Sequence, residues 1–145
     1  MNILQLIACM TTLLTTTTLA APGERIDVRD LKNKVSLTLG TKGTIQGKQE
    51  GDTLSAPTLA KEAEAKQPGI AVEFKKEAEF LALKLTNGLP KALRYRAAIR
   101  IKGRKDYVET SLILPVMPGI FSYETWQDPI EELVLFDFKL TDEKQ

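Results

Sequence analysis

The chain has 145 residues, of which 27% are charged and 43% hydrophobic, a composition that suits one folded domain and excludes a disordered polypeptide. It contains no histidine, so the side chain that most often acts as general base or metal ligand near neutral pH is missing. The formal net charge is only +1, and any binding driven by charge must therefore come from local clusters.

The N-terminus carries an uncharged segment that is typical of a secretory signal. The first charged residue is Glu24, and the apolar stretch before it ends in small residues followed by Pro22. We interpret residues 1–20 as a signal peptide cleaved after Ala20. A retained membrane anchor is disfavoured by six threonines, and a lipoprotein site at Cys9 by the few residues that precede it. The mature chain would then lack cysteine and be periplasmic or secreted.

After an N-terminal segment at 21–34, three windows alternate apolar and polar residues, at 35–39, 70–74 and 81–85. Such alternation predicts strands that pack one face on a core. Residues 40–67 lie between the first two windows and read differently. Residues 40–51 carry four glycines, and residues 58–66 are rich in Ala, Lys and Glu. We expect a loop or a short helix at 40–67.

Four more strands are expected at 93–101, 107–114, 120–126 and 133–140, separated by glycine and proline turns. The sequence therefore predicts an all-β fold, an immunoglobulin-like antiparallel β-sandwich of about seven strands over residues 35–140, followed by a tail at 141–145. The Cys, Trp, Cys spacing of antibody-type domains is absent, so the pattern indicates an architecture and no family.

The stretch LRYRAAIRIKGRKDY at 93–107 sets six basic residues among apolar ones. As a strand it directs Tyr95 to the core and a cationic row to the other face. This row is a candidate binding surface for an anionic partner, or else it pairs across the sheet with Glu109, Glu124 and Asp137. The basic candidates are Arg94, Arg96, Arg100, Lys102, Arg104 and Lys105.

Aromatic side chains form a second candidate in the strand IFSYETW. Phe121 and Tyr123 share one face, and Trp126 lies on the other, so one face should fill the core and the other should be exposed. Tyr123 and Trp126 are binding candidates because such residues are enriched at interface hot spots. Trp126 has the alternative role of capping the core.

The last predicted strand, LVLFDFKL, places Val134, Phe136, Phe138 and Leu140 on one face by simple alternation. We expect Phe136 to be buried in a central core strand.

Three acids, Asp128, Glu131 and Glu132, are close enough in sequence to act as a carboxylate pair in a small hydrolase. Their alternative role is structural, because Asp-Pro opens turns and acidic residues often precede aggregation-prone strands. The glycine-rich stretch at 40–47 lacks the spacing of a phosphate-binding loop. We therefore expect no catalytic residues, no cofactor and no metal site.

These features together predict a small exported binding or accessory module that acts by contact with a protein or an anionic envelope component. Nucleic acid is not expected as a partner, because exposed aromatic residues do not interleave with the basic row. The alternatives are the carboxylate-dependent hydrolase and a structural envelope component that pairs through an edge strand.

Overall fold

The computed structural model describes residues 23–142, apart from residue 66 and residues 111–114. The predicted signal peptide at 1–20, the end of the strand predicted at 107–114 and most of the tail at 141–145 lie outside the described residues. Within the described part of the chain, no helix has the length and apolar character needed to cross a membrane.

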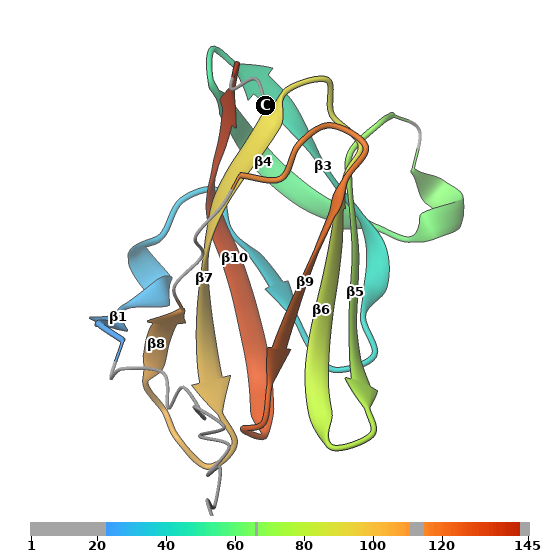
Figure 1. The fold of residues 1–145 in the computed structure, drawn as a ribbon. Helices are drawn as coiled ribbons and strands as arrows, with labels where there is room; N and C mark the ends of the chain where they lie inside the picture. The colour runs from blue at the N-terminus through green and yellow to red at the C-terminus, as the bar shows by residue number, and fades with distance from the viewer. Residues whose placement is uncertain (1–22, 66, 111–114, 143–145) are drawn as a thin grey trace, which may run out of the picture.

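The fold is an all-β sandwich in which all neighbouring strands are antiparallel (Figure 1). The first layer contains, in spatial order, β1 (Arg25–Ile26), β8 (Tyr107–Thr110), β7 (Ala92–Ile101), β10 (Ile130–Thr141) and β2 (Val35–Leu37). The second layer contains β4 (Thr53–Ala60), β3 (Lys42–Glu50), β5 (Ile70–Glu77), β6 (Phe80–Asn87) and β9 (Phe121–Trp126). Two short 3₁₀ helices, η1 (Val28–Asp30) and η2 (Glu62–Glu64), lie outside the layers.

All seven strands expected from alternation are present, as β2 and β5 to β10. Residues 40–67 differ from the expectation of a loop or short helix, because most of them form the hairpin of β3 and β4 and only Glu62–Glu64 form a short 3₁₀ helix. A β-bulge in this hairpin, between Gln46 and Lys48, falls opposite Ala56 and Pro57. Ala56 has a positive φ of 46°, and its N–H donates to Asn33 Oδ1 at 3.0 Å. Proline in a sequence normally argues against a strand, but a β-bulge accommodates it. The strand β4 could therefore not be recognised from its local sequence.

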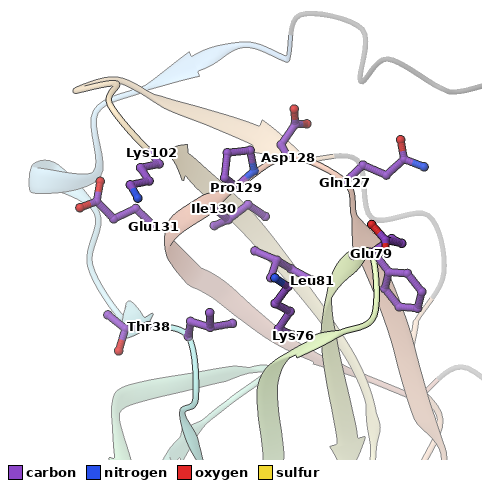
Figure 2. A pocket seen from close by; sticks show the side chains of 12 residues that line it. Thr38, Lys76, Glu79, Leu81, Lys102, Gln127, Asp128, Pro129, Ile130 and Glu131 are labelled. Atoms are coloured by element: carbon purple, nitrogen blue, oxygen red, sulfur yellow. The ribbon is translucent and has the colours of Figure 1, made fainter.

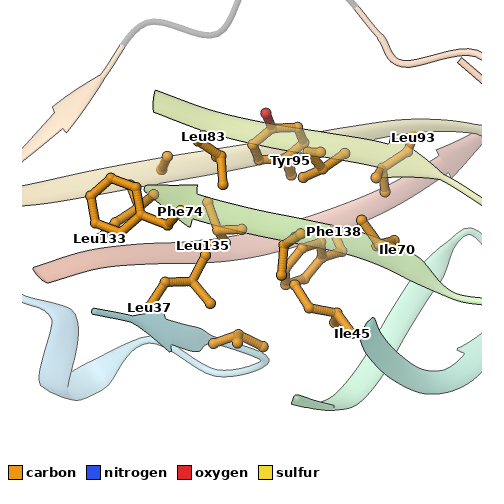
Figure 3. Close-up of a cluster of buried hydrophobic side chains, with 14 of the residues drawn as sticks. Leu37, Ile45, Ile70, Phe74, Leu83, Leu93, Tyr95, Leu133, Leu135 and Phe138 are labelled. Carbon is orange, nitrogen blue, oxygen red and sulfur yellow. The ribbon is translucent and has the colours of Figure 1, made fainter. Parts of the chain in front are cut away.

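The main core fills the space between the layers, with large side chains from both (Figure 3). Phe74, Leu83 and Leu85 come from the second layer, while Leu93 and Leu135 come from the first, and all five are fully buried. Tyr95 also faces this core, as the alternation in β7 predicted. Burial of these apolar surfaces is the main term that favours folding.

Strand β10 contradicts the simple alternation expected for LVLFDFKL. Leu133 and Leu135 face the main core, and so does Phe138, whereas Phe136 lies in a separate cluster on the outer face. The pairing with β7 shifts by one residue between Phe136 and Lys139, and Asp137 has a φ of 53°. This β-bulge inserts one residue and reverses which face the following side chains occupy.

The outer cluster is covered by the N-terminal segment. Ile26, Val28 and Leu31 pack with Tyr107 against a group that includes Phe136. Residues 27–31, which follow the edge strand β1, therefore cover part of the outer face of β7 and β10, so that β10 is buried on both faces.

We predict that Phe136→Ala lowers the free energy of unfolding by about 3–5 kcal/mol, because the side chain is 1% exposed and its removal leaves a cavity. Denaturant unfolding measures this loss. Phe136→Leu keeps most of the apolar volume and should cost clearly less. Equal stability of wild type and Phe136→Ala would contradict the placement of this ring.

Candidate functional site

The basic row lies on the outer face of β7, as alternation predicted. Arg96 forms a two-pronged contact with Glu109 on β8, with Nε–Oε1 and Nη2–Oε2 distances of 2.7 and 2.6 Å. Its guanidinium is 3.8 Å from Asp137 and lies 4.9 Å from the centre of the Phe136 ring. The hydrogen bonds from Arg96 lower the pKa of Glu109. Arg96 is thus a bridge between β7, β8 and β10.

Arg100 is held in a similar way at the other end of the row. Its Nη1 lies 2.5 Å from Glu131 and its Nη2 3.3 Å from Glu132. The Tyr107 hydroxyl donates to Glu132, which also accepts a hydrogen bond from Ser36 at 2.9 Å. Burial raises the pKa of Glu132, but the hydrogen bonds outweigh this effect and the net pKa is lowered.

The structure therefore confirms Glu109 and Asp137 as acidic partners of the row. Glu124, the third acid predicted to pair with it, lies elsewhere, and that part of the prediction is wrong. Arg94 is exposed on the same face as Arg96, while Lys102, Arg104 and Lys105 are exposed in the turn after β7. A role for the row in binding stays a prediction.

Large apolar and aromatic side chains are exposed mainly at β9. Of the described residues, five large apolar or aromatic side chains are exposed, and three of them are Ile120, Phe121 and Tyr123, at 52%, 57% and 43%. We call these three residues the β9 surface. Lys84 on β6 borders it, with Nζ 5.0 Å from the centre of the Phe121 ring.

A proline-glycine turn leads the chain into β9. The Ile120 N–H donates to the Met117 carbonyl at 3.0 Å, and Gly119, with a φ of 73°, follows Pro118. The Pro-Gly sequence, the hydrogen bond across the turn and the positive φ of Gly119 together identify a type II turn. The turn fixes the start of β9 against β6, because Asn87 N–H donates to the Ile120 carbonyl at 3.0 Å.

That hydrogen bond also determines which backbone groups of β9 are free of β6. Backbone groups point alternately to the two sides of a strand, and the β6–β9 register is regular from Phe121 to Trp126. The backbone C=O of Ile120 points to β6, so the backbone N–H and C=O groups of Ser122 and Glu124 point to β6 as well. The N–H and C=O groups of Phe121, Tyr123 and Thr125 point to the opposite side, where the described sheet ends.

Glu124 lies on the inner face of β9, between the two layers. The Tyr95 hydroxyl donates to Glu124 Oε1 at 2.8 Å and lies 3.3 Å from Ser122 Oγ. Burial raises the pKa of Glu124, although the hydrogen bond from Tyr95 opposes the shift. Burial and the nearby Glu124 likewise raise the pKa of Tyr95, which keeps its hydroxyl proton. Within the described residues, no salt bridge involves Glu124.

Trp126, the second aromatic candidate, has the core-capping role. It is partly buried against the main core, and its ring meets Phe74 edge to face at a centroid distance of 6.4 Å. The structure thus separates the two predicted candidates, because Tyr123 is exposed and Trp126 packs inward. The alternation in IFSYETW predicted that Tyr123 and Trp126 lie on opposite faces of the strand. Which of the two faces is exposed depends on the opposing layer.

Two of the three candidate hydrolase acids line a depression of about 660 Å³ at one end of the sandwich (Figure 2). Asp128 and Glu131 line it together with Lys102 and the apolar side chain of Ile130. Glu132 is instead engaged with Arg100, Tyr107 and Ser36. The described residues contain no group of acids or cysteines suited to hold a metal ion.

Comparison with known proteins gave no match to a family model, to a curated protein or to a solved structure.

We predict that Arg96 and Glu109 stabilise the fold jointly, with a coupling energy of about 1 kcal/mol or less at neutral pH because the pair is partly exposed. A double-mutant cycle with Arg96→Ala and Glu109→Ala measures it by denaturant unfolding. The folded pKa of Glu109 is lowered, so the coupling should be lost in acid as the pH falls through that pKa. Additive effects at neutral pH would refute the pairing.

We predict that Glu124→Gln stabilises the protein at pH 7. Glutamine still accepts the Tyr95 hydrogen bond but carries no charge into the interior. The folded pKa of Glu124 is raised, so its ionised form lowers stability above that pKa, and the loss disappears as the pH falls towards the unfolded value of about 4.3.

The measurement is the free energy of unfolding of both proteins at pH 7 and near pH 4, with the exposed Glu79→Gln as control. The advantage of Glu124→Gln should shrink at the lower pH. A variant less stable than wild type at pH 7 would show that the ionised carboxylate favours the fold.

Proposed function

We propose that this protein is a non-catalytic binding module that recognises a protein partner through the β9 surface. The observation that carries the proposal is that Phe121 and Tyr123 are exposed on one face of β9, a strand at the end of its layer, with Ile120 exposed immediately before the strand. Contiguous exposed apolar residues with a polar rim are a property of interaction sites. Lys84 beside Phe121 and Glu77, which hydrogen-bonds to Tyr123, supply polar groups around this surface.

The basic row is the weaker candidate for the same function. Arg96 and Arg100 each contact two carboxylates, which offset the positive charge of these two guanidinium groups. Aromatic contacts with Phe136 and Tyr107 further fix the two guanidinium groups. An anionic partner would have to compete with these internal contacts, whereas the β9 surface is already exposed.

The sequence supports two finer proposals about setting and architecture. The uncharged segment at 1–20 supports export, with the periplasm as the site of action. The strand spacing and the two-layer arrangement support an immunoglobulin-like variant of the sandwich, in which β9 and β7 belong to opposite layers.

The proposal predicts that Phe121→Ser combined with Tyr123→Ser abolishes retention of a partner from an extract of the source cells. Immobilised wild type and variant are compared, and retained proteins are identified by mass spectrometry. Leu59→Ser is the matched control, because Leu59 is an exposed apolar side chain on β4. The triple change of Arg94, Arg96 and Arg100 to Ser tests the basic row.

A partner lost only with the β9 variant supports the proposal. Retention of the same proteins by the β9 variant, together with their loss from the arginine variant, would move the binding surface to β7. Each variant is first shown to unfold cooperatively, so that loss of binding is not loss of fold.

A further inference from the structure

The two layers of the sandwich end at different places on the β9 side. Ser122 and Glu124 of β9 contact Tyr95, so β9 lies over β7. The first layer continues past β7 through β8 and then β1, but in the described residues the second layer ends at β9 (Figure 1). The inner faces of β8 and β1 therefore have no described strand of the second layer above them.

The burial of side chains agrees with this offset. Ala97 and Ile99 of β7 are buried, at 0% and 5% exposed. Their neighbours across the pairing with β8 are Thr110 and Val108, which are on the same inner face and are only partly buried. The space next to β9 is thus bordered, among the described residues, by the partly buried side chains of Val108 and Thr110 and by the outward-pointing backbone groups of β9.

We propose that this space receives one extended strand of a partner protein, which pairs with β9 and places a lysine or arginine beside Glu124. The inference rests on the proposed function and specifies how the partner is recognised. The backbone groups of Phe121, Tyr123 and Thr125 supply the hydrogen bonds of strand addition. Phe121 and Tyr123 contact side chains on the outer face of the added strand.

Charge complementarity identifies the basic residue. Glu124 is a partly buried carboxylate whose hydrogen bond comes from a neutral hydroxyl. Arg25 of β1, which is on the same side of the first layer, is already paired with Asp106 at 3.3 Å. Glu124 would oppose the added strand at a position without direct hydrogen bonds, where side chains approach most closely. A cation there would satisfy the carboxylate.

A second copy of β9 in antiparallel pairing does not fit this space. Antiparallel pairing of two β9 strands relates the copies by a two-fold axis perpendicular to the sheet, which puts both first layers on the same side. Strands in a layer are about 4.8 Å apart, so β8 of one copy would occupy the place of β7 in the other. A strand that pairs antiparallel with β9 must therefore belong to a segment that has no second layer of its own on the side of β7.

The test uses two synthetic peptides, one of alternating threonine and lysine and one of alternating threonine and glutamate. Each is titrated into the isotopically labelled full chain, and amide resonances are followed by NMR. We expect the lysine peptide to shift the amides of Phe121, Tyr123 and Thr125 and to slow their exchange with solvent. It should bind roughly fivefold more tightly than the glutamate peptide.

Two pairs of variants separate strand addition from other modes of binding. Thr125→Pro removes an N–H that points away from β6, and proline is tolerated at such an edge position. Thr125→Ala keeps the N–H and is the matched control. We expect loss of peptide binding in Thr125→Pro alone. Glu124→Gln should remove the preference for lysine over glutamate, whereas Glu50→Gln, at the exposed end of β3, should leave it.

Equal binding to Thr125→Pro and Thr125→Ala would overturn strand addition. Equal affinity for the two peptides, or an unchanged preference in Glu124→Gln, would overturn the role of Glu124. No binding of either peptide to wild type would also overturn the inference, even if the partner in the extract is lost with Phe121→Ser and Tyr123→Ser. The proposed function fails separately, when that partner is retained.

Discussion

Burial of β10 on both faces is the constraint on which the rest of the structure depends. Its inner face contributes Leu133 and Leu135 to the main core, and its outer face contributes Phe136 to the cluster under the N-terminal segment. The bulge at Asp137 then returns Phe138 to the inside. Because β10 pairs with β7 and β2 and, past the bulge, with β4, one bent strand joins the two layers.

The same strand determines which polar groups are satisfied. Pairing with β10 and β8 brings carboxylates from both sides to the arginines of β7, so Arg96 and Arg100 are held within the first layer. Strand β9 has a described neighbour on one side only, β6. The guanidinium groups of Arg96 and Arg100 on β7 are therefore already engaged, whereas β9 has backbone groups on one side without a described partner strand. The row of basic residues in β7 is nevertheless the more unusual feature of the sequence.

Local alternation was sufficient for seven strands, because each has one face on the core. It failed for β3 and β4, where glycines, Pro57 and the bulge opposite it obscure the pattern. Alternation also failed after Asp137, because the extra residue of the β-bulge changes which face the following side chains occupy. The residue types in this stretch do not indicate the bulge. For the site, alternation separated Tyr123 from Trp126, but exposure depends on how far the opposing layer extends, which a single sequence does not contain.

For Glu124, the sequence predicted the correct face of β9 but the wrong partner, namely the arginines of β7. Alternation put Glu124 on the face of β9 opposite Tyr123, and the arginines on the face of β7 opposite Tyr95. Once β9 is stacked on β7 through Tyr95, Glu124 faces the interior and the arginines face away from it. Pairing between them is then geometrically excluded. A carboxylate to which the described residues bring no cation, at the end of a layer, is a position where a partner's charge can determine specificity.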